Sequence, residues 1–237
     1  LGTAVHIGAV EIRSLHELAL DDVVIYDKQA EAVLRADEAR VTLRLLSLLS
    51  APETSIDEIL LTGAHVDVVR RADGSWNYDD IGADDGKPST FEGRIRVADA
   101  TANVDTNGNV YELRAITGTV DIDHSDVSYD LTGALSGVPL RVRGTYVGGT
   151  QELDLSATDT DGMPLLKYLP ESSLPEEIRV NTLHADRVHM EMRRVDGVTT
   201  FDGRVDGVHG TADIYGTKTD LQTSAFRFNE REVFLAA

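Results

Sequence analysis

Apolar and polar residues alternate along most of this chain. In "GVPLRVRGTYV" (residues 137–147), Val138, Leu140 and Val142 alternate with arginines, and in "RVHMEMR" (187–193) the apolar positions are again every second residue. A period of two is typical of strands that have one apolar and one solvated face. The pattern predicts a mainly β protein with one long, twisted, mostly antiparallel sheet.

Short glycine-containing turns separate the expected strands. Such closely spaced strands favour antiparallel meanders over βαβ crossovers, which need a dozen or more connecting residues. A slip of the alternation before Val127 predicts a β-bulge or a tight turn at that point. The expected turns are Asp73-Gly74, Asp85-Gly86, Asn107-Gly108, Gly148-Gly149, Asp196-Gly197 and Asp206-Gly207.

Two stretches depart from the β pattern and predict short helices. Leucines at a spacing of three indicate a helix near 44–50 that ends before Pro52, and a second helix is expected near 164–169, between Pro164 and Pro170. The polar stretch 83–90 is the expected subdivision of the chain. It separates an N-terminal β segment (1–82) from further β repeats (91–237).

The composition narrows the possible partners. A net charge of −19 disfavours nucleic acid and anionic membrane surfaces as partners, because both attract clustered Lys and Arg. The sequence contains no cysteine, which excludes disulfides and thiolate chemistry. No apolar run is long enough to span a bilayer. Because the chain starts at Leu1 rather than Met, we expect any signal or anchor to lie upstream.

The sequence contains none of the usual catalytic or nucleotide-binding motifs, and we expect no enzyme activity, cofactor or metal site. Asp121 and Asp123 share a strand face, as paired carboxylates of a hydrolase might. Their neighbours on the strand are apolar and face the other way, so the solvated side of a strand is the favoured interpretation. Asp159 and Asp161 resemble the start of a calcium loop whose remaining ligands are missing.

Histidine and tryptophan residues are two further candidates for a functional site. The closest histidines, His184 and His189, have an odd separation that predicts opposite faces of a continuous strand, so surface histidines are favoured over a metal site. Trp76 could offer a platform for carbohydrate, but a lone tryptophan is more often a plug at the end of a core.

Three segments together resemble the AsmA-like superfamily, most of all its translocation and assembly module (TamB) branch. They are "LHELALDDVVIYD" (15–27), "LRADEARVTLRLLSLL" (34–49) and "SIDEILLTGAHVDVVRRADGSWNYDDI" (55–81). Asp73, Gly74, Trp76 and Asn77 stand where the family has its "dG.wN" turn, and Ala64 replaces the usual proline.

The resemblance implies a sheet curled into an open, U-shaped groove that conducts phospholipid acyl chains across the periplasm of a diderm bacterium. It also implies attachment to the inner membrane and an Omp85-type outer-membrane partner. Each methylene kept from water is worth ~0.8 kcal/mol, so an apolar groove would lower the barrier to transfer. The expected lining residues are Val66, Val68, Val120, Ile122, Tyr129, Leu131, Leu140, Val142, Leu153, Leu155, Val188, Met190, Met192, Phe226 and Phe228.

Other interpretations of the apolar face stay open. The protein could be a scaffold for outer-membrane protein assembly, which pairs an exposed strand edge with a client strand. It could instead be a structural β protein with a closed, dry core, or a hydrolase with an acidic site. Exposed apolar area would also favour a homodimer through the groove or the sheet edges.

Overall fold

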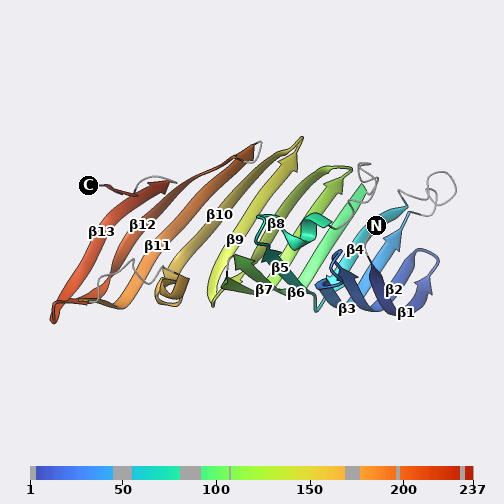
Figure 1. Cartoon of the computed structure of the whole chain (residues 1–237), viewed down its shortest axis with the longest axis horizontal. Helices are drawn as coiled ribbons and strands as arrows, with labels where there is room; N and C mark the ends of the chain where they lie inside the picture. The colour runs from blue at the N-terminus through green and yellow to red at the C-terminus, as the bar shows by residue number, and fades with distance from the viewer. Residues whose placement is uncertain are drawn as a thin grey trace. The chain divides into compact units, whose positions relative to one another are not determined.

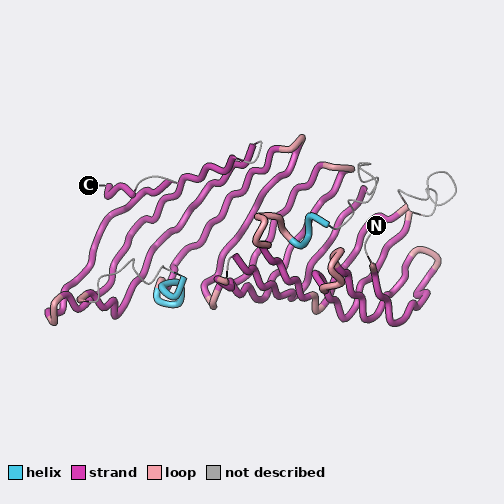
Figure 2. The backbone as a smooth tube through the Cα atoms, viewed as in Figure 1, coloured by secondary structure: helices cyan, strands magenta, loops and turns pink. Residues whose placement is uncertain are grey.

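The structure is a computed structural model that describes residues 4–44, 55–80, 92–106, 108–168, 177–195, 198–229 and 233–236. Strands make up most of these residues (Figure 2). The stretch expected to form the first helix, apart from residue 44, and the expected loop at 83–90 lie outside them. So do the predicted turns Asp85-Gly86 and Asp196-Gly197, and Asn107 of the predicted turn Asn107-Gly108.

All the described strands belong to one 14-stranded sheet, in which β5 lies off the main path by pairing with β3 and β6. The hydrogen-bonded order is β1-β2-β3-β4-β6-β7-β8-β9-β10-β11-β12-β13-β14. The bounds are β1 (Val5–Ser14), β2 (Glu17–Tyr26), β3 (Ala32–Leu43), β4 (Ile56–Thr62), β5 (His65–Arg70), β6 (Glu92–Thr106), β7 (Asn109–Asp123), β8 (Asp126–Leu135), β9 (Val138–Val147), β10 (Thr150–Asp161), β11 (Ile178–Val195), β12 (Val198–Ile214), β13 (Thr217–Asn229) and β14 (Val233–Ala236).

The mainly β, mostly antiparallel architecture predicted from the alternation is confirmed. The exceptions to the antiparallel pattern are β4 and β5, which both pair in parallel with β6. The helix expected near 164–169 is present as a 3-10 helix, η3 (Met163–Tyr168), and a second one, η2 (Asn77–Asp80), was not predicted. Asp161 caps η3, because its carboxylate accepts a hydrogen bond of 3.0 Å from the Met163 amide.

The chain divides into two compact units. Unit 1 comprises Leu1–Gly133 with Tyr146–Gly148, and unit 2 comprises Ala134–Thr145 with Gly149–Ala237. Figure 1 colours the strands of unit 1 from blue to green and most of unit 2 from yellow to red.

The predicted turns are mostly where expected. Gly74, Gly148 and Gly149 have positive φ angles of 87°, 56° and 84°, which glycine adopts at little cost. The slip before Val127 is a tight turn: His124 and Ser125 connect β7 to β8, and His124 has a φ of 57°. The prediction of a turn at Asp206-Gly207 is wrong, because both residues lie inside β12.

Gly207 is one of a set of irregular positions that occurs in each unit, and we call each set the crease of that unit. In unit 1 the crease comprises Asp22, Asp37, Gly63 and Asp99, and in unit 2 it comprises Asp159, Asp186 and Gly207. Five of these residues are left-handed, with φ of 53° at Asp22, 61° at Gly63, 54° at Asp99, 53° at Asp159 and 62° at Gly207. Such irregularities bend a strand locally.

The crease shifts the phase of the apolar pattern in unit 1. Across the crease, consecutive residues of the apolar face are three positions apart along the strand instead of two, as with Leu20 and Val23 on β2. The same step separates Ala36 from Ala39, Leu61 from Ala64, and Val97 from Ala100, and all eight residues pack in one cluster. The core of unit 1 therefore lies along the crease and is built largely of alanine. The small alanine side chain suits a bend, where the backbones of the sheet come close together.

Unit 2 repeats this arrangement. Ala157 opposes Val188 on one side of the crease, and Thr160 opposes Ala185 on the other. Ala157, Thr160 and Ala185 are all buried. β12 and β13 run through this region, and the ribbon of β13 curves along its length (Figure 1).

Candidate functional site: an apolar sheet face

The apolar face of unit 2 is a grid of directly opposed residues. Residues opposite each other in adjacent strands have side chains on the same face. One row contains Leu155, Met190, Gly203 and Phe228, and a second contains Ala157, Val188, Val205 and Phe226. A third row contains Leu153, Met192 and Phe201.

Seven predicted lining residues therefore share this face of unit 2. They are Leu153, Leu155, Val188, Met190, Met192, Phe226 and Phe228.

Aromatic side chains close one end of this grid. The rings of Phe201 and Phe228 have centroids 6.3 Å apart, and those of Phe226 and Phe228 are 6.2 Å apart. These spacings are normal for tilted aromatic pairs. Phe201 was missed in the list of lining residues, although its place opposite Met192 puts it on the same face.

The large residues of this face are only half-buried. Leu153, Leu155, Met190, Met192, Phe226 and Phe228 are all of intermediate exposure, and no large side chain among the described residues is fully buried. Because every described strand belongs to one sheet, no second sheet of the described residues covers the face. The described part of the chain thus leaves an apolar surface in contact with solvent.

The predicted residues of β8 and β9 follow the same alternation. Leu140 and Val142 are half-buried, whereas Arg141 and Arg143 next to them are exposed. Tyr129 and Leu131 on β8 are also half-buried. A Cβ atom built on Gly118 would touch the backbone of Leu131, which places Leu131 beside β7.

In unit 1 the four remaining predicted residues lie on both sides of the crease. Val66 opposes Ala102 and Val68 opposes Val104. Val120 opposes Ile95, far along β6 from these pairs. Ile122 opposes Gly93, next to Ile95 in the same direction.

Most of the apolar face of unit 1 was missed from the sequence. One row crosses six strands, and a parallel row begins with Val10 and Leu20. The six-strand row contains Ile12, Leu18, Val41, Ile59, Ile95 and Val120. Val120 was predicted, but the three-residue step at the crease hides the other five, because it interrupts the strict alternation by which lining residues were selected. A search that allowed one step of three in each strand would have found them.

Ion pairs populate exposed parts of the strands. Arg94 Nε lies 2.7 Å from the carboxylate of Asp121, which raises the pKa of Arg94. Asp123 Oδ1 lies 2.6 Å from Nδ1 of His124 and raises the pKa of that imidazole. Asp121 and Asp123 therefore act in surface pairs, as the sequence favoured, rather than as a facing pair of catalytic carboxylates.

A polar network joins β5 to β6. Nδ1 of His65 lies 2.7 Å from the hydroxyl of Thr101, and its Nε2 lies 3.0 Å from Asp67. Asp67 also accepts hydrogen bonds from Asn103 and Arg35. Burial tends to raise the pKa of Asp67, but these partners outweigh it and lower that pKa. We interpret the network as a link between strands, because each side chain is engaged by several neighbours.

The "DGSWN" turn has a structural role. Asn77 is buried, accepts a hydrogen bond of 3.0 Å from the Val69 amide and donates one of 2.7 Å to the Asp67 carbonyl. Trp76 stacks on Tyr78 at 5.8 Å and lies beside the guanidinium of Arg70 at 6.0 Å. The turn thereby folds back onto β5, and both interpretations of Trp76 stay predictions.

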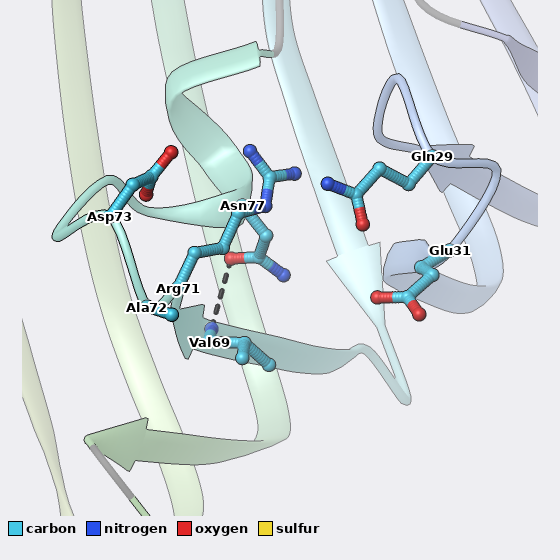
Figure 3. Close-up of a pocket in the computed structure, with 7 residues that line it drawn as sticks. All are labelled: Gln29, Glu31, Val69, Arg71, Ala72, Asp73 and Asn77. Carbon is cyan, nitrogen blue, oxygen red and sulfur yellow. Dashed lines mark hydrogen bonds between the residues drawn. The ribbon is translucent and has the colours of Figure 1, made fainter.

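Figure 3 shows a pocket of unit 1 beside this turn, lined by Gln29, Glu31, Val69, Arg71, Ala72, Asp73 and Asn77. Asp27, which is bonded to three of these lining residues, is buried and accepts hydrogen bonds of 2.8 Å from the Gln29 and Glu31 amides and of 2.9 Å from Arg71. Burial would raise the pKa of Asp27, but these hydrogen bonds outweigh it and hold the pKa below its ordinary value. The polar groups at this pocket thus stabilise two neighbouring turns.

No described helix has the length and apolar character to cross a membrane. No known protein family, curated protein or solved structure matches this chain. The relationship to AsmA-like proteins stays a prediction, and the apolar face is the feature on which a function has to be argued.

Proposed function

We propose that the apolar faces bind phospholipid acyl chains as part of a non-enzymatic, lipid-conducting groove in a diderm cell envelope. The observation that carries this proposal is the grid of Leu153, Leu155, Met190, Met192 and Phe228, whose half-buried side chains form one face. Unbranched methionines and leucines adapt to a flexible chain without a fixed binding pose.

The open, U-shaped section expected for the family belongs to the same proposal. The crease supports it, because local bends in several strands of a sheet curl it towards one face. The alanines along the crease leave room for such a bend. Attachment to the inner membrane and an Omp85-type partner are likewise part of the proposal.

Native mass spectrometry with lipid extraction tests the proposal on protein purified without detergent. We expect co-purified phospholipid in the wild type and its loss in Leu155→Asp and Met190→Asp. Ser156→Asp is the matched control, because Ser156 neighbours Leu155 on the strand and faces the other way. Lipid-free wild-type protein would refute the proposal, as would equal loss in the control with all variants folded.

A second candidate is strand pairing at β1, with a client strand or a second copy of the chain. β1 ends the sheet, all its residues are exposed, and Val10 and Ile12 have relative exposures of 61% and 76%. The Ala4 carbonyl accepts a hydrogen bond from Tyr26, so alternation directs the Ile7 amide away from β2. Ile7→Pro should abolish pairing and leave lipid binding intact, whereas Ile7→Thr should preserve both.

A further inference from the structure

We propose that two copies of this chain form a dimer by pairing their β1 strands antiparallel, about a two-fold axis between Gly8 and Ala9. The dimer rests on the strand pairing at β1 given above as the second candidate function, and it assigns both the partner and the register. β1 lies at the end of the hydrogen-bonded order, and no other described strand pairs with its outer edge (Figure 1).

The sequence of β1 has the same pattern in both directions. In "VHIGAVEI" (residues 5–12), an apolar, a polar and an apolar residue stand on each side of two small central residues. An axis at the centre of this stretch sets Val5 opposite Ile12 and Ile7 opposite Val10. A second copy of β1 is therefore complementary to the first over the whole stretch.

The crease of unit 1 places these apolar side chains on one face. Ile7 opposes Val23 on β2. Val10 opposes Leu20 there, and both partners pack in the core cluster of unit 1. Ile7 and Val10 are three positions apart, so β1 contains the same shift of phase as its neighbours. Without this shift, the axis would set apolar side chains of one copy against the polar face of the other.

The backbone groups of the same residues point away from β2. The Ala4 carbonyl accepts a hydrogen bond of 3.0 Å from an amide of β2, so alternation directs the groups of Val5 and Ile7 outward. In one strand of L-residues, side chains on the same face have N–H and C=O groups that point to the same edge. Val10 and Ile12 therefore direct theirs outward too. Each opposed pair exchanges two N–H···O bonds, which gives the dimer about eight hydrogen bonds.

The other face of β1 is complementary in charge. In this register His6 of one copy lies opposite Glu11 of the other, as a non-hydrogen-bonded pair, whose side chains approach closely. Opposite charges in such a cross-strand pair are stabilising. Within one chain, His6 Nε2 lies 3.8 Å from the carboxylate of Asp22, and Glu11 lies 3.0 Å from Nε of Arg13. Basic and acidic groups would therefore alternate along this face of the dimer.

β1 lacks the usual protection of an edge strand. Natural edge strands avoid pairing by being short or by containing lysine or proline. β1 has ten residues and contains neither of these two residue types. Its apolar side chains are exposed, up to 76% at Ile12. A second β1 would satisfy this edge and continue the apolar face of unit 1 from one copy into the next.

Cysteine cross-linking tests the register, because the chain has no cysteine of its own. A mixture of His6→Cys and Glu11→Cys proteins should form a disulfide-linked dimer under mild oxidation, since opposed Cα atoms of such a pair are about 4.5 Å apart. Either variant alone should form none, because its two cysteines would lie about 17 Å apart along the strands. A mixture of His6→Cys and Arg13→Cys is the matched control, since these diagonal neighbours are about 7–8 Å apart and beyond the reach of a disulfide.

Light scattering on a sizing column tests the dimer itself. The wild type should have twice the mass of one chain, and Ile7→Pro should be monomeric with an unchanged circular dichroism spectrum. A monomeric wild type would overturn the proposal and leave β1 to a client strand. A dimer that cross-links equally in the control mixture would overturn the register.

Native mass spectra of the same samples record bound phospholipid separately. A monomeric wild type that retains lipid would overturn the dimer and leave the lipid-binding proposal standing. A cross-linked dimer without lipid would support the dimer and refute lipid binding.

Discussion

The phenyl ring of Phe228 lies over the backbone of Gly203, its directly opposed partner on β12. A Cβ atom built on Gly203 would overlap this ring. The absence of a side chain at Gly203 therefore lets the ring cover the part of the apolar grid that lies over β12. An aromatic ring over a strand glycine protects a backbone that would otherwise be exposed.

Gly203→Ala should destabilise the protein by about 1–3 kcal/mol, the usual cost of forcing extra volume into a packed site. Urea unfolding followed by circular dichroism measures this. Phe228→Ala is the internal control. In protein that already carries Phe228→Ala, adding Gly203→Ala should cost much less, because the ring is absent. Gly203→Ala with unchanged or raised stability would show that the ring moves aside freely.

The crease requires a glycine at position 207 for two separable reasons. Gly207 has a φ of 62°, and an added Cβ would meet the side chain of Asp186. Gly216 has a φ of 77° and nothing within 4 Å of such a Cβ. Gly216→Ala should therefore show only the backbone cost of about 1–2 kcal/mol, and Gly207→Ala should cost more.

The same urea measurements compare these two glycine variants. Adding Asp186→Ala to Gly207→Ala should recover the difference between them, because it removes the steric partner. Equal losses of stability in Gly207→Ala and Gly216→Ala would mean that the contact of the added Cβ with Asp186 costs no free energy.

The sequence predicted strands well and the crease poorly, for a physical reason. Alternation reports which face a residue occupies, so the grid from Leu153 to Phe228 could be selected from the sequence alone. In Asp206-Gly207, the glycine can adopt a left-handed conformation either in a turn or within a strand. The dipeptide alone does not show which of these two structures is present. Residues such as Leu18 and Ile59 were missed because the step of three breaks the period that identifies a face.

A buried hydroxyl at the crease offers a stabilising substitution. Thr160 is 2% exposed, and among the described residues its Oγ1 is the buried side-chain atom that has no hydrogen-bond partner. An unsatisfied buried hydroxyl costs about 1–3 kcal/mol. Thr160→Val keeps the shape and removes the polar atom, so it should raise stability by about 1 kcal/mol or more.

Thermal and urea unfolding of Thr160→Val measure this gain. Thr158→Val, two residues away at an exposed position of β10, is the control and should change stability little. A loss of stability in Thr160→Val would show that the hydroxyl does find a partner, such as an ordered water molecule.

The buried carboxylate of Asp27 should make unit 1 sensitive to acid. Its pKa is held below the ordinary aspartate value by the amides of Glu31 and Gln29 and by Arg71, against the effect of burial. A group whose folded pKa is depressed stabilises the folded state above its unfolded pKa, about 3.9. That stabilisation is lost as the pH falls from there through the folded pKa, because the unfolded chain takes up the proton first. Stability should therefore fall steeply below about pH 4.

Fluorescence of the single Trp76, which lies in unit 1, follows this transition in urea at a series of pH values. Asp27→Asn should be less stable at neutral pH and show a shallower decline in acid, because it cannot take up the proton. Asp21→Asn removes one negative charge from an exposed position of β2 and controls for net charge. If Asp27→Asn and the wild type declined with the same slope, the carboxylate of Asp27 would not be the group that links folding to pH.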